Sequence, residues 1–424
     1  MKTNFLHELT WRGMVHNHTP EVEKLLQQPT TAYVGFDPTA DSLHIGNLVS
    51  LMLLVYLQRA GHTPIALIGG ATGMIGDPSG KSKERNLLDE DTIRYNLERI
   101  KLQMQKFLDF ETTENPAEIV NNYDWYKNFN VIDFLRNVGK HLTISYMIAK
   151  DSVQNRLETG ISFTEFSYQL LQGYDFYWLY THKNCRLQMG GSDQWGNITA
   201  GIELISKLIP QAQAHAITCP LLTKSDGSKF GKSEQGNIWL DANKTSPYKF
   251  YQFWLNVDDK DLPKLLRIFL PFDQATIKQL ETDNAQNPNA LKRILAKEIT
   301  TMVHSVEDYQ KAEQASQLLY GKAVLEQFEA TDLATLQEVF EGLPRQTYTA
   351  KEFESIATTT DLVALALQIS KSEANRLIKG NGVSINKTKL TIEQATQKPN
   401  FTLLKEQFLL IQKGKQYFLV EVLK

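Results

Sequence analysis

A histidine, a threonine and two glycines lie in a short polar segment between two apolar runs. The segment, residues 35–47, reads GFDPTADSLHIGN and leads into an apolar stretch with helical periodicity. Backbone N–H groups at the start of a helix bind anions, and Thr39 and His44 add side-chain donors, so charge developing on a phosphate could be stabilised here. Gly46 would let a nucleotide approach closely. A capping histidine in an ordinary loop is the alternative, and His-x-Gly alone does not exclude it.

A second segment, residues 69–81, is rich in glycine. It reads GGATGMIGDPSGK, with five glycines in its first twelve positions, and Arg85 follows. Such a loop permits positive φ angles and exposes amides, while Lys81 and Arg85 supply mobile charge suited to pyrophosphate. Asp77 amid the glycines suggests a carboxylate that faces a cationic ligand group, because an unpaired buried acid is costly. A flexible surface loop is the alternative.

Three polar residues recur within an aromatic helix predicted over residues 162–178. Tyr168, Gln172 and Asp175 fall at i, i+4 and i+7, so they share one helix face. The pattern fits a buried amino-acid pocket with three directed hydrogen-bonding groups. Periodicity alone fits a hydrated helix face equally well.

Two further segments could bind the rest of a nucleotide. Residues 188–197 read QMGGSDQWGN, where Asp193 could hold ribose hydroxyls or, more simply, Ser192 or Asp193 could cap a helix. Residues 228–233 read SKFGKS, and the lysines at 229 and 232 form a mobile cationic clamp for phosphates. Alone, this second segment also fits a solvated linker.

The elements that would position these residues alternate between strand and helix. Alternation of this kind favours a parallel sheet, so we predict a Rossmann-like α/β domain with its ligands at the carboxyl ends of the strands. After residue 247 the pattern becomes helical, with long helices over 291–304 and 306–320. The predicted strands cover residues 31–36, 64–68, 117–120, 186–189 and 217–222, with an apolar helix over 48–60.

The composition fits an ordinary globular protein of 424 residues with 42% hydrophobic and 22% charged residues. The longest apolar stretch, residues 48–57, is about half as long as a bilayer-spanning helix, so we expect a cytoplasmic protein without a membrane partner. Cys185 and Cys219 lie far apart without a ligand pattern around them, so neither a disulfide framework nor a metal site is expected.

The formal net charge of −3 hides an asymmetry. Residues 351–424 hold 11 Lys/Arg against 7 Asp/Glu, a balance of +4, which leaves −7 for the rest. A capping-box pattern at Ser370 and Glu373 predicts a helix in this basic tail, and a Gly-Asn-Gly turn follows it. A basic tail is compatible with a nucleic-acid partner, although ordinary surface charges remain the alternative.

In this order and over essentially the whole chain, the five segments resemble the bacterial type of tyrosyl-tRNA synthetase, a class I aminoacyl-tRNA synthetase. Residues 44–47 (HIGN) resemble the HIGH signature of that class, and residues 229–233 (KFGKS) resemble its KMSKS signature. Residues 73–85 and 168–175 resemble the tyrosine-specific parts. The basic tail resembles an RNA-binding module shared with a ribosomal small-subunit protein.

The resemblance implies a role for each matching residue. Tyr33 and Asp175 would meet the phenol of tyrosine, with Asp77, Tyr168 and Gln172 around its ammonium group and Gln194 near its carboxylate. The γ-phosphate of ATP would meet Thr39 and His44, Asn47 would stand in for the second signature histidine, and Gly191 and Asp193 would meet the ribose. The leaving pyrophosphate would be covered by Lys81, Arg85, Lys229 and Lys232. Further ATP contacts would come from Gly35, Asp37, Gly46, Phe230, Gly231 and Ser233, and RNA contacts from Lys371, Arg376, Lys379 and Lys387.

Two positions depart from the family pattern. Asn47 replaces the second histidine of the signature but can still donate a hydrogen bond, whereas Val34 stands where a ribose-contacting cysteine is common and cannot donate one. The implied reaction is attack of the tyrosine carboxylate on the α-phosphate of ATP, assisted by Mg²⁺ that the protein does not ligate, followed by transfer to tRNA(Tyr). Catalysis would then rest on positioning and charge stabilisation.

The resemblance also sets the expected domains and competitors. A tryptophanyl relative shares the fold and both signatures but lacks the phenol-compatible pair, and a non-catalytic RNA-binding protein would not need the retained lysines. A homodimer is implied, with a dimer-interface insertion at about 121–151. The expected domains are catalytic (1–225), signature-loop linker (226–245), helical anticodon-binding (246–330), linker (331–350) and C-terminal RNA-binding α+β (351–424).

Overall fold

The computed structural model of the chain describes residues 4–79, 87–157, 160–233, 236–320, 325–414 and 416–423. The chain divides into two compact units, of which the first comprises Met1–Ser246 and Phe253–His304 and the second Pro247–Gln252 and Ser305–Lys424. No helix within the described ranges combines the length and the apolar character that crossing a membrane requires.

A six-stranded sheet forms the centre of the first unit. Its spatial order is β1-β6-β5-β2-β3-β4, in which β2 to β6 run parallel to their neighbours and the short β1 pairs antiparallel with β6. The parallel α/β sheet predicted from the sequence is confirmed. The strands are β1 (Asn17–His18), β2 (Thr31–Phe36), β3 (Thr63–Ile68), β4 (Glu118–Asn121), β5 (Cys185–Gly191) and β6 (His215–Cys219).

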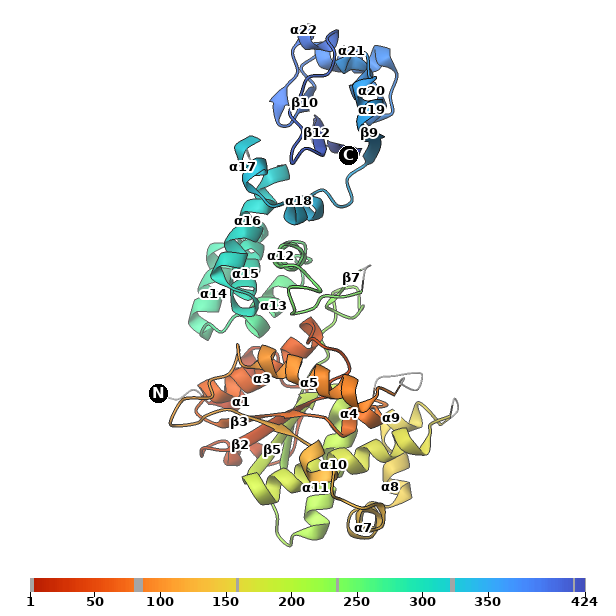
Figure 1. Ribbon diagram of the computed structural model, residues 1–424. Coiled ribbons are helices and arrows are strands. Elements are labelled where there is room, and N and C mark those ends of the chain that lie inside the picture. The colour runs from red at the N-terminus through yellow and green to blue at the C-terminus, as the bar shows by residue number, and fades with distance from the viewer. Residues whose placement is uncertain are drawn as a thin grey trace. The chain divides into compact units, whose positions relative to one another are not determined.

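Helices cover both faces of this sheet, with α3 and α5 on one face and α10 and α11 on the other (Figure 1). α3 is buried along most of its length, which explains the apolar stretch in the sequence. The helices of this part are α1 (Phe5–Trp11), α2 (Val22–Leu25), α3 (Ile45–Arg59), α4 (Thr72–Ile75), α5 (Glu90–Met104), α6 (Tyr123–Tyr126), α7 (Val131–Asn137), α8 (Ile144–Ile148), α9 (Asp151–Gln154), α10 (Phe163–Lys183) and α11 (Trp195–Leu208), with 3-10 turns η1 (Gly139–His141) and η2 (Ser192–Gln194).

The strand order reverses between β2 and β5. From β2 the chain builds the sheet outward through β3 and β4, and it then returns to place β5 and β6 on the other side. At such a switch point the loops after the two central strands diverge and leave a crevice at their carboxyl ends. The polar segments that follow β2 and β5 are therefore expected to lie on the two sides of one crevice.

The sequence predicted one helical domain over residues 246–330, but the helices of that range are divided between the two units. α13 (Leu262–Phe269), α14 (Gln274–Asp283) and α15 (Pro288–Val303) belong to the first unit, and α12 (Pro247–Leu255) begins in the second. The buried guanidinium of Arg12 donates to the carbonyls of Leu270 at 3.0 Å and Phe272 at 2.6 Å, and the Tyr56 hydroxyl donates to Ile268 at 2.9 Å. A helix end leaves carbonyls without donors, so these contacts fix α13 to the sheet domain.

The second unit contains helices and a five-stranded sheet in the order β11-β10-β12-β13-β9. We expected a linker over 331–350, but this segment forms α18 and β9, and Leu336 and Phe340 within it are fully buried. The hydrophobic core that they share with Phe408 and Leu419 explains the order of this segment. The elements are α16 (Val306–Tyr320), α17 (Leu325–Ala330), α18 (Leu333–Val339), β9 (Arg345–Thr349), α19 (Ala350–Glu354), α20 (Thr359–Leu367), α21 (Lys371–Lys379), β10 (Val383–Ile385), β11 (Thr388–Lys389), α22 (Ile392–Ala395), β12 (Phe408–Lys413) and β13 (Gln416–Leu423).

Candidate active site

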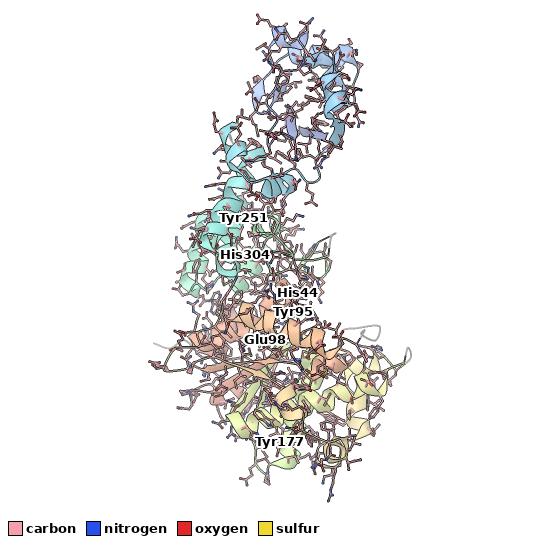
Figure 2. All side chains as sticks on the ribbon, in the orientation of Figure 1. His44, Tyr95, Glu98, Tyr177, Tyr251 and His304 are labelled. Atoms are coloured by element: carbon pink, nitrogen blue, oxygen red, sulfur yellow. The ribbon has the colours of Figure 1, made fainter. Side chains whose placement is uncertain are left out.

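His44 caps the N-terminus of α3 (Figure 2). Its Nδ1 accepts the backbone N–H of Asn47 at 3.3 Å, and the Asn47 side-chain oxygen accepts the backbone N–H of His44 at 3.1 Å. A Cβ on Gly46 would lie 2.8 Å from the His44 ring, so glycine at this position leaves room for the imidazole. The two roles considered for His44, helix cap and phosphate ligand, are therefore compatible, because the cap fixes the ring at a helix N-terminus.

The two signature segments meet directly. The backbone N–H of Ile45 donates to Ile238 O at 3.1 Å, and that of Leu240 donates to Leu43 O at 2.8 Å. The chain that follows the lysine segment (residues 229–233) therefore runs antiparallel to the chain that enters α3. Gly231, with φ of +83°, lies against the same segment, and a Cβ there would lie 3.1 Å from Ile45 Cβ. The short strands β7 (Lys232–Ser233) and β8 (Gly236–Asn237) pair next to this contact.

Asp37, just past the end of β2, connects two other predicted segments. Its Oδ1 accepts the Thr72 hydroxyl at 2.7 Å, and its Oδ2 accepts the Tyr168 hydroxyl at 2.8 Å. Burial is the largest cause that raises the pKa of Tyr168, followed by the charges of Asp37 and Asp77. Tyr168 thus remains a neutral donor, and the β2 loop, the glycine-rich loop and α10 share one hydrogen-bonded centre.

Asp175 is buried on α10 and accepts hydrogen bonds from side chains that follow β4. These bonds come from the Asn122 side chain at 3.1 Å and the Trp125 indole at 2.9 Å. Burial raises the pKa of Asp175 to about 7, against the lowering effect of these hydrogen bonds. The Asp175 carboxyl is therefore poised between its two protonation states near neutral pH.

Tyr33 lies on β2 with its hydroxyl buried, and that hydroxyl has no hydrogen-bond partner among the described residues. Burial, and then the charge of Asp175, raise the pKa of Tyr33 well above its usual value, so the hydroxyl stays protonated. An unpartnered buried hydroxyl costs about 1–3 kcal/mol, which a ligand with a polar group could recover. This orphan hydroxyl beside a buried acid marks the deep end of the candidate site.

Asp77 anchors a third cluster near the end of β5. The Gln194 side chain donates to its Oδ2 at 2.7 Å, and the Asn197 side chain donates to its Oδ1 at 3.2 Å, as does the backbone N–H of Ser79 at 3.0 Å. Asp193 follows β5 nearby, and its pKa is raised by burial first and by the Asp77 charge second, while Lys229 lowers it. The site therefore concentrates negative charge that favours a cationic ligand group, with a lysine at its margin.

The structure brings together most residues singled out from the sequence, with some differences. Thr39 and Lys229 are exposed, Gln172 is half-buried, and neither Ser192 nor Asp193 caps a helix through its side chain. Gly35 is exposed at the end of β2, and Phe230 is buried against Phe253 and Trp254. Lys81 and Arg85 lie outside the described residues, as do the side chains of Lys232 and Ser233.

The sequence did not single out Asn122, Trp125, Thr72 or Asn197. Asn122 and Trp125 follow β4, and a signal for them existed, because polar residues just past a predicted parallel strand lie at the ligand edge of the sheet. Thr72 and Asn197 lie within segments that were singled out for other residues. No group of three or more His, Cys, Asp or Glu in the described part of the chain is arranged to hold a metal ion.

In the second unit, three of the four predicted RNA-contacting residues lie on α21. Lys371, Arg376 and Lys379 are exposed there, although Lys371 pairs with Asp361 at 2.7 Å. The fourth residue, Lys387, is half-buried, and its ammonium group donates to the carbonyl of Leu319 and to the Tyr417 hydroxyl at 2.8 Å. Lys387 therefore makes an internal contact that the sequence did not indicate.

Comparisons with known proteins identify the family of this chain. A family model described as tRNA synthetases class I (W and Y) matches residues 25–321, and one described as the tyrosine–tRNA ligase SYY-like C-terminal domain matches residues 335–420. The tyrosine–tRNA ligase of Cytophaga hutchinsonii is 55% identical over 98% of this chain and 99% of its own length. That of Parabacteroides distasonis is 53% identical over 99% of this chain and its whole length.

Solved structures give the same result. A C-terminally truncated mitochondrial tyrosyl-tRNA synthetase from Coccidioides posadasii has a TM-score of 0.65 and 30% identity over 73% of this chain and 91% of its own. A tryptophanyl-tRNA synthetase from Aeropyrum pernix, at 16% identity and a TM-score of 0.51 over 74% of this chain and 86% of its own, shares the fold. The fold and the site thus define a class I tRNA synthetase of the tryptophan and tyrosine group. Within that group, the chain belongs to the tyrosine–tRNA ligase family.

Proposed function

We propose that this chain joins L-tyrosine to tRNA(Tyr) in two steps. In the first, a carboxylate oxygen of tyrosine attacks the α-phosphorus of ATP, the bond to the bridging oxygen breaks, and pyrophosphate leaves. In the second, the terminal ribose of the tRNA takes the tyrosyl group from the adenylate, and AMP leaves. The observation that carries the proposal is the unpartnered Tyr33 hydroxyl, buried beside Asp175 at the switch point of the sheet.

The phenol of tyrosine supplies what this deep end lacks. A phenol can accept a hydrogen bond from Tyr33 and donate one to Asp175, which satisfies the orphan group and uses the poised carboxyl. A site built around a hydroxyl rejects the analogue without it, a rule for which tyrosyl-tRNA synthetases are themselves an example. Asn122 and Trp125, which donate to Asp175, favour its charged form and hold its orientation.

The ammonium and carboxylate groups of tyrosine fit the polar residues that follow this deep end toward the carboxyl ends of the strands. Asp77 and Tyr168 would face the ammonium together with Gln172. The carboxylates of Asp37 and Asp77, both close to Tyr168, would stabilise this cation. Gln194, fixed by its hydrogen bond to Asp77, would lie near the tyrosine carboxylate. No side chain needs to act as a nucleophile, because the substrate carboxylate is the attacking group.

The triphosphate of ATP, which arrives with Mg²⁺, would lie along the paired signature segments. His44, Thr39 and Asn47 would contact the γ-phosphate side at the start of α3, while Lys229, Lys232, Lys81 and Arg85 would cover the pyrophosphate. Gly191 and Asp193 would meet the ribose. Charge stabilisation that strengthens as the pyrophosphate leaves would lower the barrier. The remaining ATP contacts would come from Gly35, Asp37, Gly46, Phe230, Gly231 and Ser233.

The second unit would bind tRNA(Tyr) in the cytoplasm. The exposed cations of α21 form its candidate RNA surface, whereas the internal contact of Lys387 makes it less suited to this role.

We also propose a homodimer through α7 and α8, because Val131, Ile132 and Ile144 are 70%, 71% and 61% exposed there. Large apolar side chains that stay exposed in a patch commonly mark an interface.

The decisive experiment is tyrosine-dependent exchange of labelled pyrophosphate into ATP. Exchange with tyrosine but not with tryptophan is expected, because a tryptophan side chain cannot satisfy the Tyr33 and Asp175 pair with a phenol hydroxyl. Exchange with tryptophan would favour the tryptophanyl specificity. The absence of exchange with either amino acid, with tRNA binding intact, would indicate a non-catalytic RNA-binding protein.

A further inference from the structure

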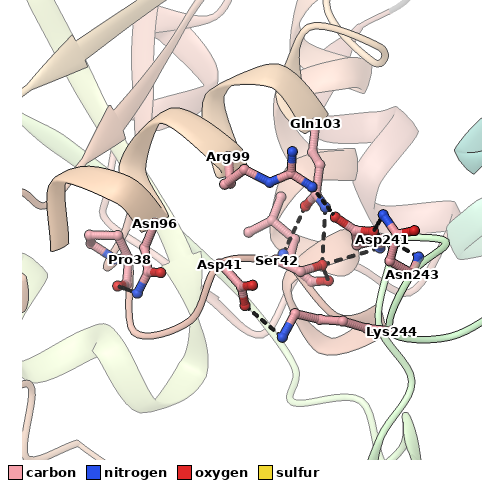
Figure 3. Close-up of polar contacts among 10 residues, drawn as sticks. Pro38, Asp41, Ser42, Asn96, Arg99, Gln103, Asp241, Asn243 and Lys244 are labelled. Atoms are coloured by element: carbon pink, nitrogen blue, oxygen red, sulfur yellow. Dashed lines mark hydrogen bonds and ion pairs between the residues drawn. The ribbon is translucent and has the colours of Figure 1, made fainter. Parts of the chain in front are cut away.

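Outside the substrate pocket, a polar network joins α5 to the chain just before the first signature segment and to the chain that follows the second (Figure 3). On α5, the side chain of Gln103 donates to the Ser42 hydroxyl oxygen at 3.0 Å and accepts the backbone N–H of Leu43 at 2.8 Å. One turn earlier on the same helix, Arg99 donates to the Asp241 carboxylate at 2.6 Å. A single helix face therefore holds the chain that enters α3 and the chain that leaves the lysine segment.

The centre of this network is fully hydrogen-bonded. The Ser42 hydroxyl, which is buried, donates to Leu43 O at 2.7 Å and accepts from Gln103 and from the backbone N–H of Asp241 at 3.2 Å. One Asp241 oxygen closes its own turn through Asn243 at 2.8 Å, and the other binds Arg99. Networks satisfied in this way favour one arrangement over its alternatives.

Asp241 carries its charge in a largely enclosed place. Its side chain is 11% exposed, against 39% for Arg99. Burial alone would raise the pKa of Asp241, but the hydrogen bonds from Asn243 and Arg99 outweigh it and keep that pKa below its usual value. The ion pair with Arg99 is thus present at neutral pH and is better shielded from water than most surface pairs among the described residues.

We propose that Arg99 and Asp241 are positioning residues for the activation step, an inference that rests on the proposed function. Their ion pair anchors residues 238–241 against residues 43–45, and that pairing sets where the lysine segment ends relative to His44. Neither residue contacts the tyrosine-binding groups on β2 and α10. The pair therefore acts on the phosphate side of the reaction and leaves the binding of tyrosine unaffected.

The test measures tyrosine-dependent pyrophosphate exchange with Asp241→Asn in the full chain. The amide keeps the shape of the side chain and loses the ion pair, so we expect kcat to fall about tenfold, as misplacement far from the chemistry does. The KM for tyrosine should change by less than about twofold. Arg99→Gln should have the same effect, and the double variant should lose no more than the worse single variant, because the pair acts as a unit.

Arg94→Gln is the matched control. It breaks the Arg94–Glu90 pair, which lies on the same helix at the same 2.6 Å but with the two side chains 66% and 51% exposed, and it should leave exchange unchanged. The inference is overturned if Asp241→Asn leaves kcat unchanged, if tyrosine KM rises along with the loss, or if the two single effects add. Should Asp241→Asn fail to fold, Arg99→Gln alone decides by the same split of kcat and KM. A wild-type chain without tyrosine-dependent exchange would instead reject the proposed function.

Discussion

The rings of His44 and Trp239 lie 6.0 Å apart between centroids, with 60° between their planes. The two residues also form an antiparallel backbone bridge. The His44 imidazole thus lies between an indole on one side and Gly46 on another, where a Cβ would come within 2.8 Å of it. Its place is determined by packing as well as by the helix cap.

Gly46→Ala separates this packing from stability. Alanine favours a helix over glycine by up to about 1 kcal/mol, which offsets much of the cost of disturbing the His44 cap, so the variant should still fold, as thermal unfolding can measure. The new methyl group must displace the His44 ring, and we expect pyrophosphate exchange to fall at least about tenfold. Tyrosine affinity, read by equilibrium dialysis, should be retained. Normal exchange would show that the ring position has no part in activation.

Several features could be predicted from the sequence because they are local. The limits of β2 and α16 agree with the predicted residues, since a short, mostly apolar run defines the first and helical periodicity the second. The partners of Asp175 were not predicted, because its contact with Asn122 and Trp125 depends on which strand lies beside which. α3 begins at Ile45, ahead of its apolar stretch, because the cap from His44 extends it. The internal contact of Lys387 is likewise a tertiary effect that a charge count cannot reveal.

The raised pKa of Asp175 predicts a pH effect on stability. Burial raises this pKa from 3.8 to about 7, so between these values the folded chain keeps a proton that the unfolded chain has lost. Stability should therefore fall as pH rises from about 4 to about 7, and then level off. Asp175→Asn should remove this contribution. Denaturant unfolding at several pH values can compare the slopes, and equal slopes in both proteins would contradict the assignment.

The same carboxyl predicts how tyrosine binding depends on pH. A phenol donates to an ionised carboxylate, so affinity for tyrosine should increase as pH rises through about 7 and Asp175 loses its proton. Asp175→Asn should bind tyrosine more weakly, with no such increase, and should discriminate less between tyrosine and phenylalanine. Titration calorimetry from pH 6 to 8 would measure both effects. Unchanged discrimination in the variant would argue against Asp175 at the phenol.

The exposed charges of α21 can be tested without removing the C-terminal sheet, whose core includes Phe340 and Leu336 from outside residues 351–424. Arg376→Gln with Lys379→Gln should weaken tRNA charging and reduce the salt slope of tRNA binding by roughly 1 to 2 units. Exchange without tRNA should be unchanged. Lys24→Gln with Lys101→Gln removes the same charge from the first unit and serves as the control. Equal salt slopes in the two variants would reject the α21 surface.

Lys387 should behave in the opposite way. Its ammonium group is held by Leu319 O at the end of α16 and by the Tyr417 hydroxyl, and it lies 4.6 Å from the centroid of that ring. Lys387→Met keeps the apolar stem of the side chain but removes the ammonium contacts with Leu319 O and the Tyr417 hydroxyl, which should cost about 1–3 kcal/mol of unfolding free energy. The salt slope of tRNA binding should stay at the wild-type value, because this charge does not face RNA. A lower salt slope with unchanged stability would mean that Lys387 leaves α16 to contact the tRNA.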